Sequence, residues 1–248
     1  TALDSIAHKT RAVVIADGPG ISDEAAITYR KDFGSQRIYV VAPGVRVWDP
    51  TINKNVVRPA SPFVAGIINR MDNEQGPWWS PSNKLIRKIS GIERPITFAN
   101  GDTTCAAHRL NENAVTTIIR KDGFKLWGNL TCASDTLWQF LSVVRTNDMI
   151  AETFNAGFDW AIDRPFSLQL LSDLENSLRF KLREFKAQGA TLGGNVWIDK
   201  ELNTLATMKA GKLYLDYDVE PPAPMQTLIL RAHRNDGYYE DLIQGETV

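Results

Sequence analysis

Residues 11–42 read RAVVIADGPGISDEAAITYRKDFGSQRIYVVA, in which two apolar runs flank a turn and a polar segment. The apolar run over residues 11–16 ends at the turn sequence DGPG (17–20), a pattern typical of a buried strand entering a turn. Ser22 is a favourable N-cap, and the two acidic residues after it suit the positive end of a helix. A second apolar run covers residues 37–42. Strand, helix and strand in this order predict a parallel layer with right-handed crossovers.

The rest of the chain extends the same pattern toward the C-terminus. Apolar residues at helical spacing predict helices over residues 59–73, 147–162 and 172–188. Further strands are expected at residues 95–99, 115–120, 138–145, 191–198, 212–219 and 226–234. The predicted fold class is therefore α/β (α+β), a mixed β-sheet flanked by helices, with a C-terminal β-rich portion and an extended C-terminal arm.

Two domains are expected along the chain. Residues 1–190 form the predicted α/β core, and residues 191–248 form a C-terminal β portion. Within that portion, the sequence PPAP (221–224) predicts a stiff extended linker, and residues 226–234 predict a terminal strand arm. A strand placed after such a linker either folds back as an edge strand or pairs with a neighbouring molecule.

Composition excludes several classes of protein. Hydrophobic residues make up 43% of the chain and charged residues 23%, as in an ordinary globular protein. The 28 basic and 29 acidic residues give a net charge of -1, which argues against a nucleic-acid binder. The sequence holds no run of 18 apolar residues that would span a membrane. Cys105 and Cys132 are expected to be buried free thiols.

Motifs for catalysis, cofactors or metals do not emerge from the sequence. The histidines His8, His108 and His233 are widely separated, and none has the spacing of a metal site. There is no G-x-S-x-G motif to mark a nucleophile. We therefore predict no catalytic, cofactor-binding or metal-binding residues, and no enzymatic activity.

An alternative function uses the turn at Asp17–Gly20. A strand, a tight turn and a helix N-terminus can hold a phosphate, which would suit an α/β enzyme or a nucleotide-binding domain. The turn matches neither G-x-G-x-x-G nor the P-loop pattern, and Asp23 and Glu24 would repel an anion. A deep pocket with clustered ionisable groups at this turn would favour the alternative.

Two aromatic features have open interpretations. On the helix over residues 172–188, a step of about 100° per residue places Phe180 nearly opposite the apolar stripe, between Arg179 and Arg183. This face is either solvated, with cations that suit a helix C-terminus, or an anchor for a protein partner. The pair Trp78-Trp79 either packs as core or clamp, or contacts a partner.

Read together and in order, many short stretches resemble the contractile phage tail sheath protein family. The resemblance is closest to the FI-type sheaths of temperate phages and the sheaths of R-type pyocins, and it runs from about residue 3 to the end. The stretches are 17–19 (DGP), 22–26 (SDEAA), 29–30 (YR), 33–35 (FGS), 72–74 (DNE), 76 (G), 80–84 (SPSNK), 116–120 (TTIIR), 122–123 (DG), 126–129 (LWGN), 131 (T), 134–135 (SD), 144–146 (VRT), 160–164 (WAIDR) and 188–190 (QGA). One departure is Leu130 and Cys132, where such sheaths usually have Arg and Leu.

The resemblance implies a function for the chain. It would be a structural subunit of the contractile tail sheath, which surrounds the inner tail tube and contracts to drive it through the target cell envelope. The implied partners are neighbouring sheath subunits in a helical homo-oligomer, the inner tail tube protein, and baseplate and tail terminator proteins, with no nucleic acid and no membrane. The implied location is a virion tail or a pyocin-like particle assembled in the host bacterial cytoplasm. A baseplate or other adaptor protein that shares the sheath fold is a further alternative.

The resemblance also assigns roles to particular residues. A C-terminal strand donated to a neighbouring subunit would comprise Thr227, Leu228, Ile229, Leu230 and Arg231. The residues Arg179, Phe180, Arg183 and Lys186 are the hypothetical contact with the tube. The proline linker at 221–224 would let subunits pivot while they stay connected. We expect the chain to be a fragment that lacks the N-terminal part of the family, so that polymerisation depends on a segment before Thr1.

Overall fold

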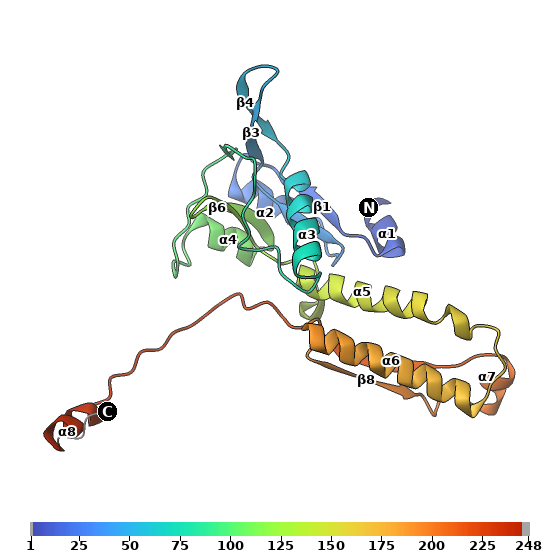
Figure 1. Cartoon of the computed structure of the whole chain (residues 1–248). Helices are drawn as coiled ribbons and strands as arrows, with labels where there is room; N and C mark the ends of the chain where they lie inside the picture. The colour runs from blue at the N-terminus through green and yellow to red at the C-terminus, as the bar shows by residue number, and fades with distance from the viewer. Residues whose placement is uncertain (1, 245–248) are drawn as a thin grey trace.

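A four-stranded sheet forms the centre of the N-terminal half in a computed structural model that describes residues 2–244 (Figure 1). Its strands are β1 (Val14–Asp17), β2 (Ile38–Val41), β6 (Val115–Arg120) and β7 (Phe124–Trp127), in the order β1-β2-β6-β7. β1 pairs with β2 and β2 with β6 in parallel, and β7 pairs with β6 in antiparallel orientation. The predicted parallel layer and the α/β class are confirmed.

Side chains alternate between the two faces of this sheet, as the period of two along a strand requires. From β2, Ile38 and Val40 pack into a cluster with α2 (Asp23–Lys31) and α4 (Ala106–Glu112). Tyr39 and Val41 pack on the other face, into a cluster with α3 (Ser61–Glu74). Because both faces are covered by helices, β2 is buried at every position.

The predicted start of α2 is confirmed in detail. Ser22 has an extended backbone, and its hydroxyl accepts a hydrogen bond from the backbone N–H of Ala25 at 3.1 Å. This bond satisfies one of the orphan N–H groups of the first helical turn.

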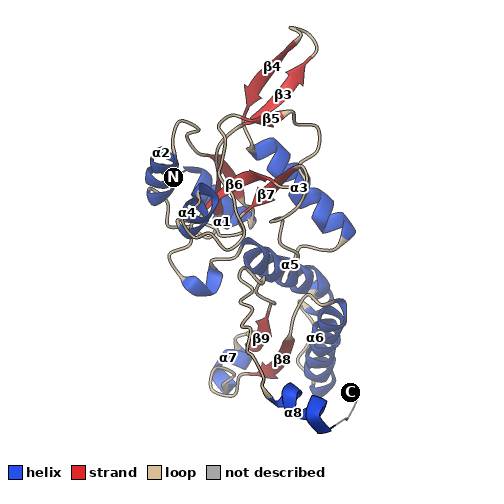
Figure 2. Ribbon diagram, turned by 90° about the vertical axis from the view of Figure 1, so that its left-hand side faces the viewer, coloured by secondary structure: helices blue, strands red, loops and turns tan. Residues whose placement is uncertain are grey.

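A three-stranded sheet carries the most prominent projection of the molecule. β3 (Val45–Asp49) pairs with β4 (Lys54–Arg58) and with the short β5 (Gly91–Ile92). The β3–β4 hairpin extends away from the rest of the fold, as Figure 2 shows. Sequence patterning did not predict this hairpin.

Helices and a two-stranded sheet form the C-terminal unit. α5 (Leu141–Gly157) and α6 (Leu168–Gln188) lie beside the antiparallel strands β8 (Gly193–Ile198) and β9 (Leu215–Glu220), with the short α7 (Leu205–Lys209) between the strands in sequence. Their shared cluster contains residues such as Phe154, Leu182 and Val196. It therefore joins residues from both sides of position 190, where we predicted a domain boundary.

Helix α5 links the two units through ion pairs. The Arg37 guanidinium holds both carboxylate oxygens of Asp148, with Nη2 2.8 Å from Oδ1. Arg145 holds Asp72 of α3 in the same two-pronged manner, with Nη1 2.9 Å from Oδ1. Two-pronged arginine–carboxylate pairs fix orientation as well as distance, so α5 is tied to the sheet unit at two points.

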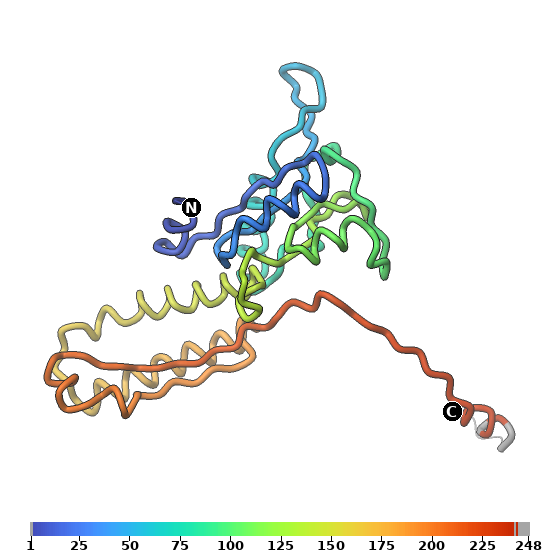
Figure 3. The backbone as a smooth tube through the Cα atoms, turned by 180° about the vertical axis from the view of Figure 1, so that it is seen from behind, coloured from blue at the N-terminus to red at the C-terminus, as the bar shows by residue number. Residues whose placement is uncertain are grey.

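The chain ends in an extended arm that leaves the body of the molecule. Residues 221–236 form no helix and no strand, and the short helix α8 (Gly237–Gln244) follows them (Figure 3). At the other end, α1 (Ala2–Thr10) precedes β1, and single 3-10 turns occur at Thr136–Trp138 and Asp159–Ala161. In the described part of the chain, none of the helices is long and apolar enough to cross a membrane.

Three predicted strands are absent from residues 2–244. Residues 95–99 do not pair with a strand because the Thr97 carbonyl accepts a hydrogen bond from Ala107 N, at the start of α4. Residues 138–145 include the first turn of α5, whose residues 141–144 are all buried, so their apolar pattern resembled that of a strand. Residues 226–234 do not fold back as an edge strand within the chain.

Candidate assembly surfaces

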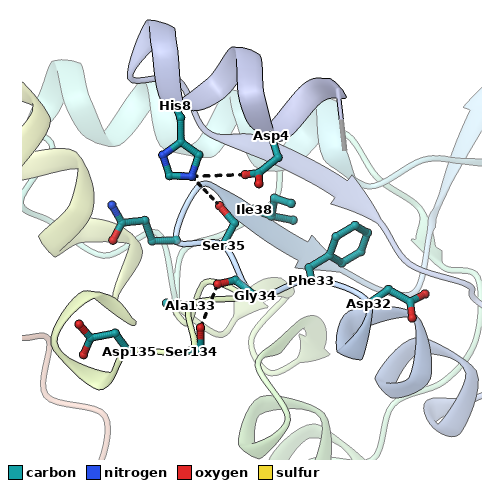
Figure 4. A pocket seen from close by; sticks show the side chains of 11 residues that line it. Asp4, His8, Asp32, Phe33, Gly34, Ser35, Ile38, Ala133, Ser134 and Asp135 are labelled. Atoms are coloured by element: carbon teal, nitrogen blue, oxygen red, sulfur yellow. Dashed lines mark hydrogen bonds and ion pairs between the residues drawn. The ribbon is translucent and has the colours of Figure 1, made fainter.

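A shallow pocket beside α1 brings together the residue types of a catalytic triad. Figure 4 shows His8 between Asp4 and Ser35, with His8 Nε2 3.2 Å from Ser35 Oγ and 3.6 Å from Asp4 Oδ1. Both contacts involve the same ring nitrogen. A nucleophilic triad needs the hydroxyl on one nitrogen and the carboxylate on the other, so this arrangement does not activate Ser35.

The turn at Asp17–Gly20 is occupied by carboxylates. Asp17 accepts hydrogen bonds from both the backbone N–H and the hydroxyl of Ser61, and so caps the start of α3. The Glu93 carboxylate accepts from Gly44 N at 3.0 Å and lies where a Cβ on Gly20 would stand. A phosphate placed at this turn would meet two negative charges, so the geometry does not suit the nucleotide-binding alternative.

The described residues contain no candidate metal-binding site. Within residues 2–244, no group of three or more His, Cys, Asp and Glu side chains is placed to hold a metal ion. The two thiols, Cys105 and Cys132, are free and buried in the cluster on the α2 face of the sheet.

The predicted contact face of α6 is mostly on the surface. Phe180 is 64% exposed, and Arg183 and Lys186 are exposed beside it. Arg179 differs, because its guanidinium donates to Glu175 Oε1 at 2.7 Å and to the carbonyl of Val196 in β8 at 3.2 Å. Three of the four residues are therefore available to a partner, and the fourth supports the packing of α6 on the sheet.

An apolar groove of about 590 Å³ runs beside Phe180. The end of α5 and the following turn supply Phe158 and Trp160 to its wall. The Arg164 guanidinium lies over the Trp160 ring, 4.9 Å from its centroid. Aromatic rings with arginines nearby are typical of the central part of a protein–protein interface.

The predicted donated strand lies on the arm. Leu228, Ile229 and Leu230 are all exposed, at 66%, 76% and 85% of their surfaces. Residues 227–234 pair with no strand among residues 2–244. Three consecutive large apolar side chains on an unpaired extended backbone suit addition to the sheet of another molecule.

Sequence patterning missed two surface features that depend on tertiary structure. The β3–β4 hairpin exposes Trp48 on its surface. The Trp78-Trp79 pair borders a groove together with Pro222 and Pro224, which are more than 140 residues further along the chain. A tryptophan pair between prolines was the only sequence signal for the second feature.

Comparison with known sequences decides the family. The sequence model of the family described as phage tail sheath protein central domain matches residues 1–132. The model described as phage tail sheath C-terminal domain matches residues 133–234. The chain belongs to the phage tail sheath family. The family resemblance seen in the sequence is thereby confirmed. The two matches meet at residues 132 and 133, just before α5, and the predicted domain boundary at 190 stays a prediction.

Curated tail sheath proteins are similar over nearly all of this chain. A putative prophage major tail sheath protein of Pseudomonas aeruginosa (strain UCBPP-PA14) is 41% identical over 243 residues, which cover 98% of this chain and 63% of that protein. The tail sheath protein of Escherichia phage P2 is 33% identical over 243 residues, which cover 98% of this chain and 61% of that protein. The chain thus spans a little over three fifths of the length of these relatives.

Solved structures share the fold. The helical sheath of the anti-feeding prophage in its contracted state aligns with a TM-score of 0.75 at 21% identity, over 90% of this chain and 61% of that chain. The sheath complex of an extracellular contractile injection system in its contracted state, termed PVC, aligns with a TM-score of 0.75 at 18% identity, over 90% of this chain and 64% of that chain. At these identities the likeness establishes the fold alone.

Proposed function

We propose that this chain is the assembly core of a contractile tail sheath subunit, a structural protein and not an enzyme. The observation that carries the proposal is the continuous match of both sheath domain models to residues 1–234. The role of such a subunit is to surround an inner tail tube and to contract, which drives the tube through the target cell envelope. No cofactor is part of this function.

The partner bound most extensively would be another copy of the same subunit. A helical sheath is built from heterologous contacts that repeat without closing into a ring. The exposed arm supports this arrangement, because residues 227–231 offer an unpaired backbone and large apolar side chains to a neighbouring sheet. Baseplate and tail terminator proteins would bind at the ends of the same lattice.

The α6 surface is the proposed contact with the inner tube. Phe180 supplies an apolar anchor, while Arg183 and Lys186 supply cations that are exposed beside it. Contacts between exposed charges weaken as salt rises, so such an interface separates more readily on contraction than a wholly apolar one. Arg179 contributes indirectly through its bonds to Glu175 and Val196.

Charge reversal tests the tube contact. In Arg183→Glu/Lys186→Glu, assembled sheaths should co-sediment with purified tubes several-fold less than the parent does at low salt. As a control, reversing a single exposed charge away from this face, by Lys209→Glu in α7, should leave co-sedimentation unchanged. Equal co-sedimentation of all three proteins would contradict a role for this face of α6.

The particle that contains this subunit would be a virion tail or a pyocin-like particle assembled in the host bacterial cytoplasm. The near-neutral charge of -1 supports a protein lattice rather than a nucleic-acid or membrane partner. Contraction would be a rigid-body rearrangement between two packings, driven by the difference in their interface energies.

Electron microscopy tests the proposed function. The protein in its full natural length should form hollow helical tubes whose wall repeats one subunit. A protein that stays monomeric at high concentration, in the presence of its tube, would contradict the proposal.

A further inference from the structure

The proline segment is packed against the body of the protein. Pro221 is buried, and Pro222 and Pro224 are half-buried, whereas Ala223 between them is exposed. The segment follows β9 directly, and the last carbonyl of that strand, on Glu220, accepts a hydrogen bond from Leu192 N at 2.8 Å. The chain therefore enters this segment from a fixed strand end and keeps one side against the protein.

Two tryptophans and the end of α6 form the groove beside the prolines. Trp78 packs against the cluster of the C-terminal unit, and a Cβ on Gly76 would overlap its ring. Trp79 lies at the rim with Lys84, whose Nζ is 5.3 Å from the Trp79 ring centroid. Gln188 and Gly189, at the C-terminus of α6, also line the groove. Aromatic side chains that line a groove are a common means of binding an extended proline segment.

The last contact between the segment and the body is at Gln226. Its Nε2 donates a hydrogen bond to Oδ1 of Asn129, which is 5% exposed. The backbone carbonyl of Asn129 accepts from Leu141 N at 2.9 Å, at the first residue of α5. Asn129 thus connects the root of the arm to the helix that links the two units. Beyond Gln226, residues 227–236 are exposed at every position.

We propose that residues 221–226 are a fixed anchor, held by the tryptophan groove and Asn129, and that the arm pivots only from Thr227 onward. This changes the expectation that the prolines themselves are the pivot. Proline has a locked φ and loses little freedom on packing, so it suits an anchor better than a hinge. The inference rests on the proposed function only for the role of the arm in joining subunits.

The proposed anchor would also determine where tension on the arm is transmitted to the rest of the protein. The groove takes Trp79 from the loop after α3 and Gly189 from the end of α6. Asn129, which holds Gln226, follows β7 and accepts a hydrogen bond from the first residue of α5. Tension on the arm would therefore reach both units at the place where they join, without first unfolding the strand pair β8–β9.

Distance measurements between spin labels test the anchor on the chain alone. Nitroxides on Glu112→Cys in α4 and Ala223→Cys should give one narrow distance distribution by double electron–electron resonance. The pair on Glu112→Cys and Leu230→Cys should give a broad one. Cys105 and Cys132 are buried and will not react with the label in the folded protein. Equally broad distributions for both pairs would overturn the proposal.

Variants of the groove identify what holds the segment. In Trp79→Ala/Gln226→Ala, the distribution of the Glu112–Ala223 label pair should broaden to resemble that of the Glu112–Leu230 pair. The control Trp48→Ala removes an exposed tryptophan from the distant hairpin and should leave the first distribution narrow. An unchanged narrow distribution in the double variant would overturn the assignment of Trp79 and Gln226. Because these labels report on the isolated chain, failure of the anchor is distinguishable from failure to form tubes.

Discussion

The buried ion pair between Arg37 and Asp148 is the residue-scale contact on which the two-unit arrangement most depends. Arg37 is 7% exposed and lies directly before β2. Asp148 is 8% exposed and lies in the middle of α5. Removing one partner of a buried pair leaves the other charge without compensation, which costs about 3–5 kcal/mol. Neither residue was singled out from the sequence, because 111 positions separate them.

Arg37→Met should therefore lower the free energy of unfolding by about 3–5 kcal/mol, measured by urea denaturation. The second change in Arg37→Met/Asp148→Leu should recover most of the loss, since it removes the stranded carboxylate. The exposed substitution Arg183→Met should change stability by less than about 0.5 kcal/mol. A loss below about 1 kcal/mol in Arg37→Met would show that α5 is held mainly by apolar packing.

Cys132 predicts a dependence of stability on alkaline pH. Burial raises the pKa of its thiol from the ordinary 9.0 to about 11, because the thiolate would lose its hydration in the sheet cluster. Below pH 9 the thiol is protonated in both states, and its contribution to stability is fully present. Between pH 9 and about 11 only the folded chain keeps the proton, so stability falls as pH rises.

The corresponding measurement compares pH slopes rather than absolute stabilities. From pH 8.5 to 10.5, the parent should lose roughly 1.5–2 kcal/mol more than Cys132→Ala does, because each pKa unit corresponds to about 1.4 kcal/mol and this window covers most of the interval between the two pKa values. Cys105→Ala serves as the control for deleting a buried thiol. Parallel pH profiles for the parent and Cys132→Ala would contradict this assignment.

At the scale of single elements, α6 shows how much local pattern determines. The predicted apolar stripe is buried, at Leu174, Leu178, Leu182 and Phe185, and Phe180 lies on the exposed side as helical spacing requires. The helix also ends at Gln188 as predicted, and Gly189 after it has a φ of 81°. The contact of Arg179 with Val196 was not predictable, because it depends on where β8 packs.

Other elements were misread for physical reasons. The first turn of α5 is buried at all four positions from Leu141 to Val144, so it has no exposed polar face to give a helical period. The β3–β4 hairpin has apolar and charged residues on its exposed face, so its pattern did not separate it from a loop. The arm was predicted as a strand from its apolar residues, and any strand pairing lies outside the isolated chain.

Gly189, in a left-handed conformation, caps the C-terminus of α6. Gly189→Ala should destabilise the protein by about 1 kcal/mol, because a left-handed conformation crowds a Cβ against the following carbonyl. The matched control is Gly157→Ala at the end of α5, where the space is open and no left-handed conformation is present. That variant should be neutral or stabilising in the same urea titration. Equal effects of the two substitutions would contradict the capping role of Gly189.

At the scale of the whole molecule, residues 2–244 form two units joined by α5 and an extended arm that leaves them (Figures 1 and 3). The sheath family and the α/β class were readable from the sequence because many short stretches typical of the family occur along the chain in the family's order. The groove beside the prolines was not readable, since it brings together Trp79 and Gly189 from distant positions. What the arm would join in the proposed lattice cannot be read from one chain.

The central claim is that the exposed arm connects sheath subunits, and electron microscopy of arm variants tests it most directly. Ile229→Asp, introduced into the protein of full natural length, places a charge in the middle of the proposed strand, where a paired position would bury it. The matched control Ile21→Asp changes another largely exposed isoleucine, in the loop before α2. We predict hollow tubes from the parent and from Ile21→Asp, and folded but unassembled protein from Ile229→Asp. Tubes formed equally well by Ile229→Asp would contradict the claim.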